Sequence, residues 1–340
     1  MKIGITFDLK VDLSGRPDLP DDFQEEFDSP ATVEAIANVL RGLGHQVELL
    51  GDGRELLARL LADPPDFVFN FAEGQGVGRC REARVPAVLE MLDIPYTGSD
   101  PFTLAATLDK DCAKRLVASA GVAVPKGFIV SRDADSSFRE TMNLTFPVIV
   151  KPAWEGSSKG IRGKCVVDTP EELIAAIENL RQAYQQPVLV EEYITGDELT
   201  VGVIGNDPPR VIGVMRVLPQ QAEDRFVYSL EVKRDWERRV RYEVPAQLPP
   251  RRLEAVEKAA LASFGALGCR DVARIDFRLR EGTPYFLEAN PLPGLNPDYS
   301  DLVILARGAG WSYEQLIGTV LQEATDRHAR AATTVTTAST

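Results

Sequence analysis

Residues 273–279 read Ala-Arg-Ile-Asp-Phe-Arg-Leu, and residues 285–290 read Tyr-Phe-Leu-Glu-Ala-Asn. In the first stretch apolar residues alternate with charged ones, which is the period of a half-buried β-strand. Arg274 and Asp276 therefore share one face of the first strand, and Glu288 and Asn290 share one face of the second. The two stretches predict a hairpin with a polar face and an apolar face, and this hairpin is the strongest local indication of the fold.

The turn between the two strands decides whether these polar side chains meet. If the loop is the three residues Glu281 to Thr283, Asp276 lies opposite Glu288, and two carboxylates and the amide oxygen of Asn290 converge. A slip of one residue would place them on opposite faces, and the sequence leaves that register open. Oxygen ligands held close together suit Mg²⁺, so the hairpin predicts a magnesium site. The alternative is the solvated face of an edge hairpin.

A loop rich in glycine and serine follows an apolar strand that ends at Lys151. This loop, Gly156-Ser157-Ser158-Lys159-Gly160, can turn backbone N–H groups toward phosphates while a lysine supplies point charge. Lys110, near the start of a helix, and Lys233, in a polar loop, are further candidates for phosphate binding. The plainer interpretations are a flexible hairpin loop and two surface lysines.

The chain of 340 residues is acidic, with 38 Lys and Arg against 51 Asp and Glu and a formal net charge of −13. This balance argues against a nonspecific nucleic-acid binder, which needs a basic surface to displace counterions. With only two histidines, a zinc- or histidine-based site is disfavoured. The four scattered cysteines, the absence of an export signal and the lack of a long apolar run predict a cytoplasmic protein without a membrane span.

The order of predicted elements divides the chain. The first hundred residues alternate strand and helix patterns, which predicts an α/β domain with an open parallel sheet. A polar, Asp- and Pro-rich stretch separates its first strand from a helix that begins at Ser29-Pro30. The remaining residues mix helices with antiparallel strands, which predicts α+β units. We expect an N-terminal domain over 1–100, a central subdomain over 101–190, a C-terminal subdomain over 191–326 and a disordered tail over 327–340.

Several short motifs resemble the ATP-grasp superfamily and, within it, the D-alanine–D-alanine ligase-like carboxylate–amine ligases. The resemblance extends from the first strand to about residue 325, and several blocks in the family's order make it specific. It implies the ATP-grasp fold, in which two α+β subdomains clasp ATP beside the N-terminal domain. The motifs are Ile94-Pro95-Tyr96-Thr97-Gly98-Ser99, Leu108-Asp109-Lys110, Pro147-Val148-Ile149-Val150-Lys151-Pro152, Glu155-Gly156-Ser157-Ser158, Arg274-Ile275-Asp276 and Leu287-Glu288-Ala289-Asn290-Pro291-Leu292-Pro293-Gly294.

The resemblance also implies roles for individual residues. Asp276, Glu288 and Asn290 would hold two Mg²⁺ ions, with Mn²⁺ able to substitute. Arg274, the backbone N–H of Gly294 and the lid residue Ser157 would form the catalytic group, with Arg274 and Gly294 facing the oxyanion. The residues that would bind ATP are Lys110, Lys151, Gly156, Ser158, Glu191, Glu192, Ile194, Glu198 and Lys233.

The implied reaction is ATP-dependent formation of an amide or peptide bond between small molecules, amino acids or compounds like them. Phosphoryl transfer to the carboxylate would make an acyl phosphate, which the amine then attacks. The alternative is a nucleotide- or amino-acid-binding protein that has lost catalysis, although a pure binder has no need of an oxyanion arginine. Neither nucleic-acid nor membrane partners are expected, and the family is compatible with a homodimer.

The substrate half departs from the family pattern. The loop after the third strand lacks the family's histidine and carries Glu73, and the mobile loop has Arg234 where a tyrosine is frequent. The first-strand loop is replaced by a long acidic insert, and the sequence after Gly294 is also different. These departures put D-alanine in doubt and predict a rebuilt pocket, although the side chains could instead point to solvent or pair with one another. The candidate substrate residues are Glu73, Tyr228, Arg234, Asn296 and Ser300, with Arg81 as a further guanidinium for a second carboxylate.

Overall fold

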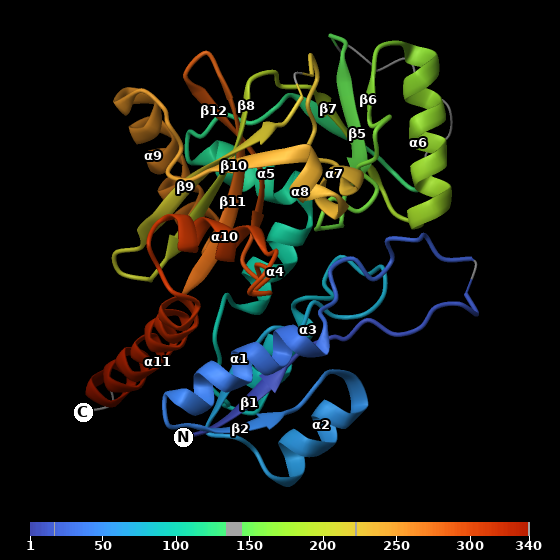
Figure 1. Ribbon diagram of the computed structural model, residues 1–340. Helices are drawn as coiled ribbons and strands as arrows, with labels where there is room; N and C mark the ends of the chain where they lie inside the picture. Colours follow the sequence, from blue (N-terminus) through green and yellow to red (C-terminus); the bar gives the residue numbers. More distant parts are fainter. Residues whose placement is uncertain (17, 134–144, 222, 339–340) are drawn as a thin grey trace.

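The computed structural model describes residues 1–16, 18–133, 145–221 and 223–338. Its N-terminal sheet has three parallel strands in the order β2-β1-β3, which confirms the predicted open parallel sheet (Figure 1). Ser29 caps the first helix by accepting the Thr32 N–H, and Pro30 is its first residue, as the sequence predicts. The elements are β1 (Lys2–Thr6), α1 (Pro30–Gly42), β2 (Gln46–Leu49), α2 (Gly53–Ala62), β3 (Phe67–Asn70) and α3 (Arg84–Met91).

The next two helices position Lys110. A single helix is expected near Thr107 to Ala120, but the structure has α4 (Pro101–Leu108) and α5 (Lys110–Ser119). The break falls at Asp109, whose side chain accepts the Cys112 N–H and caps α5. Lys110 is therefore the first residue of a helix, with its side chain buried against the site.

The central sheet has four antiparallel strands in the order β4-β7-β5-β6, covered by one helix. The helix packs its apolar stripe, which includes Leu173 and Ile177, on the strands. Lys151 lies near the end of β5, so the glycine-rich loop begins at the edge of this sheet. The elements are β4 (Gly127–Val130), β5 (Val148–Pro152), β6 (Val166–Val167), α6 (Pro170–Tyr184) and β7 (Val188–Glu192).

The C-terminal sheet has five antiparallel strands in the order β10-β9-β8-β11-β12, and the predicted hairpin forms its edge. A core cluster that includes Phe277 and Phe286 packs under it against α5 and α9. The elements are β8 (Asp197–Ile204), β9 (Arg210–Pro219), α7 (Leu230–Arg234), α8 (Trp236–Arg239), β10 (Val240–Glu243), α9 (Pro250–Leu267), β11 (Val272–Arg280), β12 (Thr283–Asn290), α10 (Asp301–Gly308) and α11 (Tyr313–Ala338).

The hairpin reaches the expected register by another route. Arg280 pairs directly with Thr283, so the loop has two residues and not the three expected. A bulge at Leu287, where Asp276 pairs with Glu288 but Phe277 pairs with Phe286, restores the offset. The carboxylates of Asp276 and Glu288 therefore lie opposite each other, as the predicted metal site requires.

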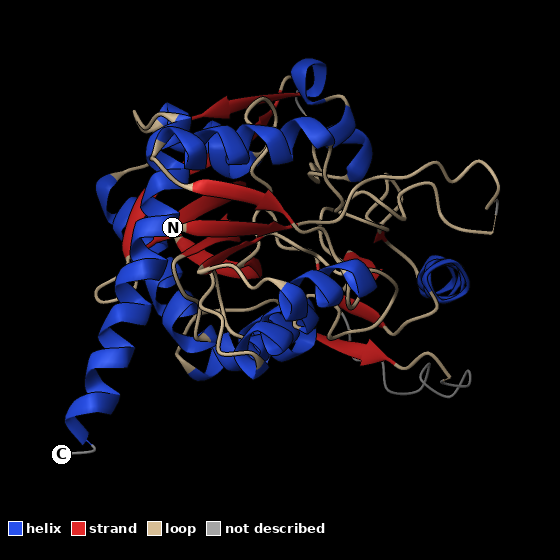
Figure 2. Cartoon of the chain, turned by 90° about the horizontal axis from the view of Figure 1, so that it is seen from below, coloured by secondary structure: helices blue, strands red, loops and turns tan. Residues whose placement is uncertain are grey.

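The expected disordered tail is corrected over most of its length. The helix α11 continues to Ala338 and projects from the body of the molecule (Figure 2). Arg327 donates to both carboxylate oxygens of the fully buried Asp271, at 3.0 and 2.8 Å, and His328 packs its ring against Tyr96. Composition alone missed this because two polar residues anchor the helix; residues 339 and 340 lie outside the described part of the chain.

In the described parts of the chain, no helix combines the length and the apolar character needed to span a bilayer.

Candidate active site

The hairpin β11–β12 presents four polar side chains on one face. Its ladder pairs Asp276 with Glu288 and Arg274 with Asn290. The Arg274 guanidinium lies 3.0 Å from Asp276 and 3.5 Å from Asp301, and it is 8% exposed. Burial alone would lower the pKa of Arg274, but the charges of Asp276 and Asp301 outweigh it and raise that pKa, so the guanidinium stays charged.

Three lysines, from different elements, influence the carboxylate of Glu288. Lys110 at the start of α5 lies 2.7 Å from it, and Lys151 and Lys233 act on it from farther away. Burial would raise the pKa of Glu288, but these three charges together lower it well below its ordinary value. The fold thus brings together the lysines that sequence reasoning singled out from three separate segments.

The donor set fits a divalent cation. Asp276 and Glu288 supply carboxylate oxygens on neighbouring strands, and Asn290 adds an amide oxygen. The pKa of Asp276 is raised by burial and by the nearby charge of Glu288, although Arg274 opposes this shift. A cation between the two carboxylates would relieve their repulsion, so these residues suit hard-cation binding.

A cavity of about 70 Å³ lies between the central and C-terminal sheets. Lys151 lies 2.6 Å from Glu191, which also pairs with Lys114 at 3.0 Å, and Glu198 pairs with Arg278 at 2.7 Å. Burial would lower the pKa of Lys151, but the charge of Glu191 raises it, so the lysine stays protonated. The expected residues that line this one cavity are Lys151, Ser158, Glu191, Glu192, Ile194, Glu198, Tyr228, Lys233, Asp276 and Glu288.

The glycine-rich loop lies over the site, and its backbone adopts a conformation that few residue types favour. Ser157 and Ser158 both have left-handed backbone, with φ of 49° and 59°. The Ser158 hydroxyl donates to the Tyr228 carbonyl oxygen at 3.0 Å, which ties this loop to the segment before α7. The N–H of Gly156 donates to a protein carboxylate, Glu26, at 2.6 Å, rather than standing free for a phosphate as expected.

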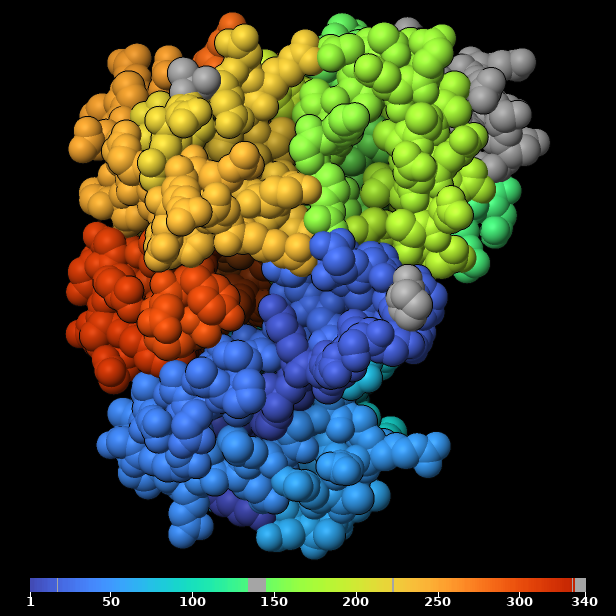
Figure 3. All heavy atoms as spheres, turned by 45° about the vertical axis from the view of Figure 1, so that its right-hand side comes forward, coloured from blue at the N-terminus to red at the C-terminus, as the bar shows by residue number. Residues whose placement is uncertain are grey.

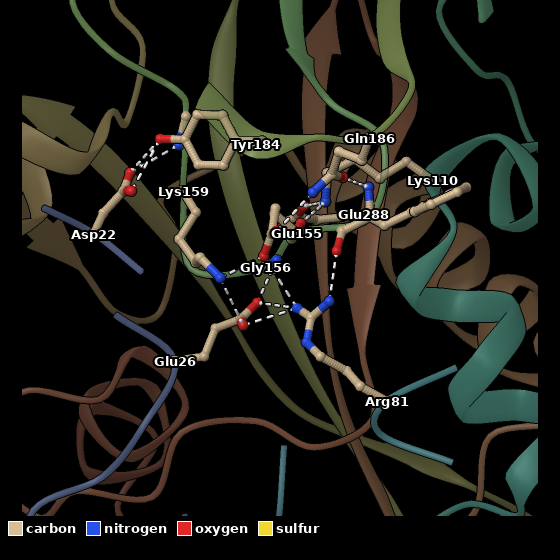
Figure 4. A network of polar contacts seen from close by, with 12 residues as sticks. Asp22, Glu26, Arg81, Lys110, Glu155, Gly156, Lys159, Tyr184, Gln186 and Glu288 are labelled. Atoms are coloured by element: carbon tan, nitrogen blue, oxygen red, sulfur yellow. Dashed lines mark hydrogen bonds and ion pairs between the residues drawn. The ribbon is translucent and has the colours of Figure 1, made fainter. Parts of the chain in front are cut away.

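Glu26 belongs to the acidic insert between β1 and α1, whose contacts sequence reasoning missed (Figure 4). Its carboxylate accepts from Arg81 at 2.8 and 2.9 Å and from Lys159 at 3.2 Å. Arg81 and Lys159 also pair with Glu155, so the charges of two buried acids and two buried bases cancel. Arg81 is only 1% exposed and is fully used in this cluster, so it is not the free guanidinium expected for a substrate carboxylate.

Neighbouring residues of the insert contact both the glycine-rich loop and the segment that carries Arg234. Asp22 accepts the Gly160 N–H at 3.0 Å and the Tyr184 hydroxyl at 2.7 Å. Asp21 and Glu25 accept from Arg234, at 2.9 and 2.7 Å. Arg234 is therefore paired with the insert, on the short helix α7 that replaces the expected polar loop. In the space-filling view the dark-blue insert lies directly against the green and yellow residues of the other two subdomains (Figure 3).

We call residues 21–26 the insert clasp. The acidic pairs Asp21-Asp22 and Glu25-Glu26 are the sequence signal for it, but their side-chain partners lie at least 55 residues away along the chain.

Two further cavities meet at Arg274, Gly294 and Ser157. The larger, about 340 Å³, is lined by Tyr228, Arg234 and Ser300 together with the insert. The smaller, about 50 Å³, is lined by Glu73 and by the end of the hairpin that carries Glu288 and Asn290. A Cβ on Gly294 would lie 2.9 Å from the Ser300 hydroxyl, which explains a glycine at the junction.

Asn296 does not line either of these cavities. It is 4% exposed and donates to Thr32 at 2.8 Å, while its backbone N–H donates to Ser300. Asn296 thus joins the loop that follows Gly294 to α1, and it has a structural role in place of the expected substrate contact. Sequence position alone could not distinguish the two roles.

The three-sheet architecture and this arrangement of lysines, carboxylates and a buried arginine define an ATP-grasp enzyme. Residues 116–322 match the family described as D-ala D-ala ligase C-terminus. A D-alanine–D-alanine ligase of Aquifex aeolicus is 34% identical over 292 residues, which cover 85% of this chain and 93% of the relative. The chain therefore belongs to the D-alanine–D-alanine ligase family of ATP-dependent carbon–nitrogen ligases.

A further relative is similar in sequence, and two solved structures share the fold. A protein of Sinorhizobium fredii called uncharacterized protein y4sG is 34% identical over 310 residues, which cover 87% of this chain and 88% of the relative. A solved D-alanine–D-alanine ligase from Bacillus anthracis has a TM-score of 0.76 at 24% identity, covering 97% of this chain and 99% of that one. The VanG D-Ala:D-Ser ligase from Enterococcus faecalis has a TM-score of 0.72 at 23% identity, covering 95% and 99%.

Proposed function

We propose that this ligase joins an amino acid, or an amino-acid-like carboxylate, to an amine through an acyl phosphate, with two Mg²⁺ ions for which Mn²⁺ can substitute. The observation that carries the proposal is the position of Arg274. It stands on the same strand face as Asp276, opposite Asn290, and it lines both cavities that open beside Gly294. A nucleotide-binding protein without catalysis would have no use for a buried guanidinium at that junction.

Different residues would bind the phosphates of ATP and the metal ions in the first step of the reaction. Lys110, Lys151 and Lys233 supply point charges for the phosphates of ATP, and Asp276, Glu288 and Asn290 would hold the metal ions. When bound, Mg²⁺ supplies positive charge that offsets the negative phosphate oxygens. These groups let a carboxylate oxygen of the first substrate attack the γ-phosphorus, with ADP leaving.

The second step breaks the carbon–oxygen bond that joins the acyl group to the phosphate. The amine attacks the carbonyl carbon of the acyl phosphate, and phosphate leaves as the amide forms. Arg274 and the N–H of Gly294 would face the negative charge of the tetrahedral intermediate. The lid residues Ser157 and Ser158 and the helix that carries Lys233 keep water from the acyl phosphate.

We propose further that the substrate pocket is rebuilt and that D-alanine alone is a poor substrate pair. The smaller cavity is lined by Glu73, which stands near the family's missing histidine, and the insert clasp forms a wall of the larger one. Since a buried polar group left without its partner is costly, such replacements change the accepted substrate. Tyr228 and Ser300, which line the larger cavity, would contact the second substrate.

The test is an ADP-release screen of amino-acid pairs, both enantiomers, with ATP and Mg²⁺. We expect one or more pairs to release ADP and form an amide in equal amounts, and D-alanine alone to give little dipeptide. Tight ATP binding without turnover for every pair would support the inactive alternative. Efficient formation of D-alanyl-D-alanine, at rates comparable to the best pair, would contradict the rebuilt pocket.

A further inference from the structure

Asp301, the first residue of α10, has no role in the reaction described above. Its side chain lines both the cavity between the sheets and the larger cavity beside Gly294, and Tyr228 and Lys233 do the same. Among the described residues, Asp301 is the one acid that lines both of these cavities. Its carboxylate therefore lies where the space proposed for ATP meets the space proposed for the second substrate.

The two oxygens of the Asp301 carboxylate have different surroundings. Oδ1 accepts a hydrogen bond from the Tyr228 hydroxyl at 3.0 Å. Oδ2 lies 3.5 Å from Arg274 and 4.0 Å from Lys233, beyond the usual range of a hydrogen bond, and it accepts none from the described part of the chain. Arg274 donates instead to Asp276, at 3.2 and 3.0 Å. One oxygen of Asp301 is thus held in place, and the other can accept an N–H group from a substrate.

Tyr228 fixes the orientation of this carboxylate. Its hydroxyl also contacts the hydroxyl of Tyr242, and its side chain is buried. Burial and the charge of Asp301 raise the pKa of Tyr228 well above its ordinary value, so the hydroxyl stays protonated and donates to Oδ1. A base whose direction is set by a third group is the usual arrangement in general acid–base catalysis.

The step that forms the amide needs a proton acceptor. An amine nitrogen becomes positively charged as it bonds to the carbonyl carbon, and it must lose a proton before the amide is complete. The other acids of the larger cavity are less suited to take this proton. Glu25 and Glu26 pair with bases, and Asp28 forms no ion pair with Arg274 in the described part of the chain. Asp301 is the acid that lies beside the proposed oxyanion group.

We propose that Asp301 is the general base of the second step, an assignment that rests on the proposed ligase function. The amine enters from the larger cavity, and its N–H donates to Oδ2 while its nitrogen attacks the carbonyl carbon near Arg274. As the nitrogen–carbon bond forms, the proton moves from nitrogen to Oδ2. The carbon–oxygen bond to phosphate then breaks, its electron pair leaves with the phosphate, and the amide is complete. The protonated carboxyl gives its proton to water when the products leave.

Hydroxylamine separates the two steps of the reaction. It is uncharged near neutral pH and attacks an acyl phosphate without a catalytic base, and the hydroxamate that it forms gives a coloured complex with ferric iron. Asp301→Asn removes the base but keeps an oxygen that can accept the Tyr228 hydroxyl. With the carboxylate substrate found by the ADP-release screen, ATP and Mg²⁺, we expect this variant to form hydroxamate at the wild-type rate. With the amine found by the same screen, its kcat for amide formation should fall about a hundredfold.

Asp298→Asn, at an exposed position in the loop before α10, is the matched control and should keep both rates. Equal loss of hydroxamate and amide in Asp301→Asn would mean that Asp301 only supports the structure of the site, and would overturn its role as a base. An unchanged kcat for amide formation, with or without a raised KM for the amine, would overturn it as well. Both results leave the ligase function intact. If the wild type forms neither product, the ligase function itself fails, and the role of Asp301 fails with it.

Discussion

Glu288 is the residue on which the metal site and the lysines converge. Glu288→Gln removes one of the proposed metal-binding carboxylates and the partner of Lys110. Because bound metal supplies several kcal/mol of charge stabilisation, turnover should fall about a hundredfold in a steady-state ADP-release assay. Glu281→Gln, in the exposed turn of the same hairpin, is the control and should keep wild-type turnover. Undiminished turnover by Glu288→Gln would contradict the site.

Lys151 and Lys114 offer a matched pair, because both contact Glu191 but only Lys151 lines the cavity between the sheets. Lys151→Met should weaken ATP binding about ten- to hundredfold, the worth of a charge-assisted contact to phosphate. Lys114→Met breaks a similar ion pair and should leave ATP affinity within about threefold of wild type. Calorimetric titration with ATP separates the two results; equal losses would mean that Lys151 acts through Glu191 alone.

The residue pattern predicted which polar side chains share a face of the hairpin, but it did not predict the length of the turn or the bulge. The alternation of residues 273–279 fixes which side chains share a face, since strands have period two. The expected loop length was wrong, and the bulge at Leu287 compensates for it. A bulge depends on tertiary packing, and neither side of Leu287 carries a glycine to signal it. The same limit explains Asn296, whose partner Thr32 lies on a distant helix.

The acidic residues of the insert clasp are visible in the sequence, but only the tertiary contacts show what they bind. Glu26→Gln should destabilise the protein by about 3–5 kcal/mol, because it leaves the buried Arg81 and Lys159 short of a charge. Glu25→Gln loses a partly exposed pair with Arg234 and should cost at most about 1 kcal/mol. Urea unfolding of the two variants measures the difference. Equal and small losses would mean that the buried cluster does not hold the lids.

Helices and strands of this chain were predictable where their signals are local. Ser29-Pro30 begins α1, and the apolar and alternating runs give the three strands of the N-terminal sheet and the hairpin β11–β12, since caps and periodicity act within one element. The break at Asp109 was not predicted, although an aspartate followed by a helix is an N-cap signal. The insert could be recognised as polar but not placed, because its partners lie in loops and helices that are far from it along the chain.

At the scale of the whole molecule, α11 joins the N-terminal domain to the C-terminal subdomain. Its residues Leu316 and Ile317 pack in the same core as Ile3 and Ile5 of β1. A chain ending at Asp326 would lose Arg327 and leave the buried Asp271 without its base, at a cost of about 3–5 kcal/mol. A chain ending at His328 keeps that contact and should lose less than about 1 kcal/mol. Similar thermal and urea stability for both truncations would contradict the anchoring role.

The acyl phosphate is the central claim, and one isotope experiment tests it most directly. The carboxylate substrate found in the screen is labelled with heavy oxygen in both carboxyl oxygens, and the inorganic phosphate released with Mg²⁺ and ATP is analysed by mass spectrometry. Because a carboxylate oxygen attacks the γ-phosphorus and then leaves with it, each phosphate should carry one heavy oxygen atom and the amide should keep the other. Unlabelled phosphate, or label found in AMP, would contradict the mechanism.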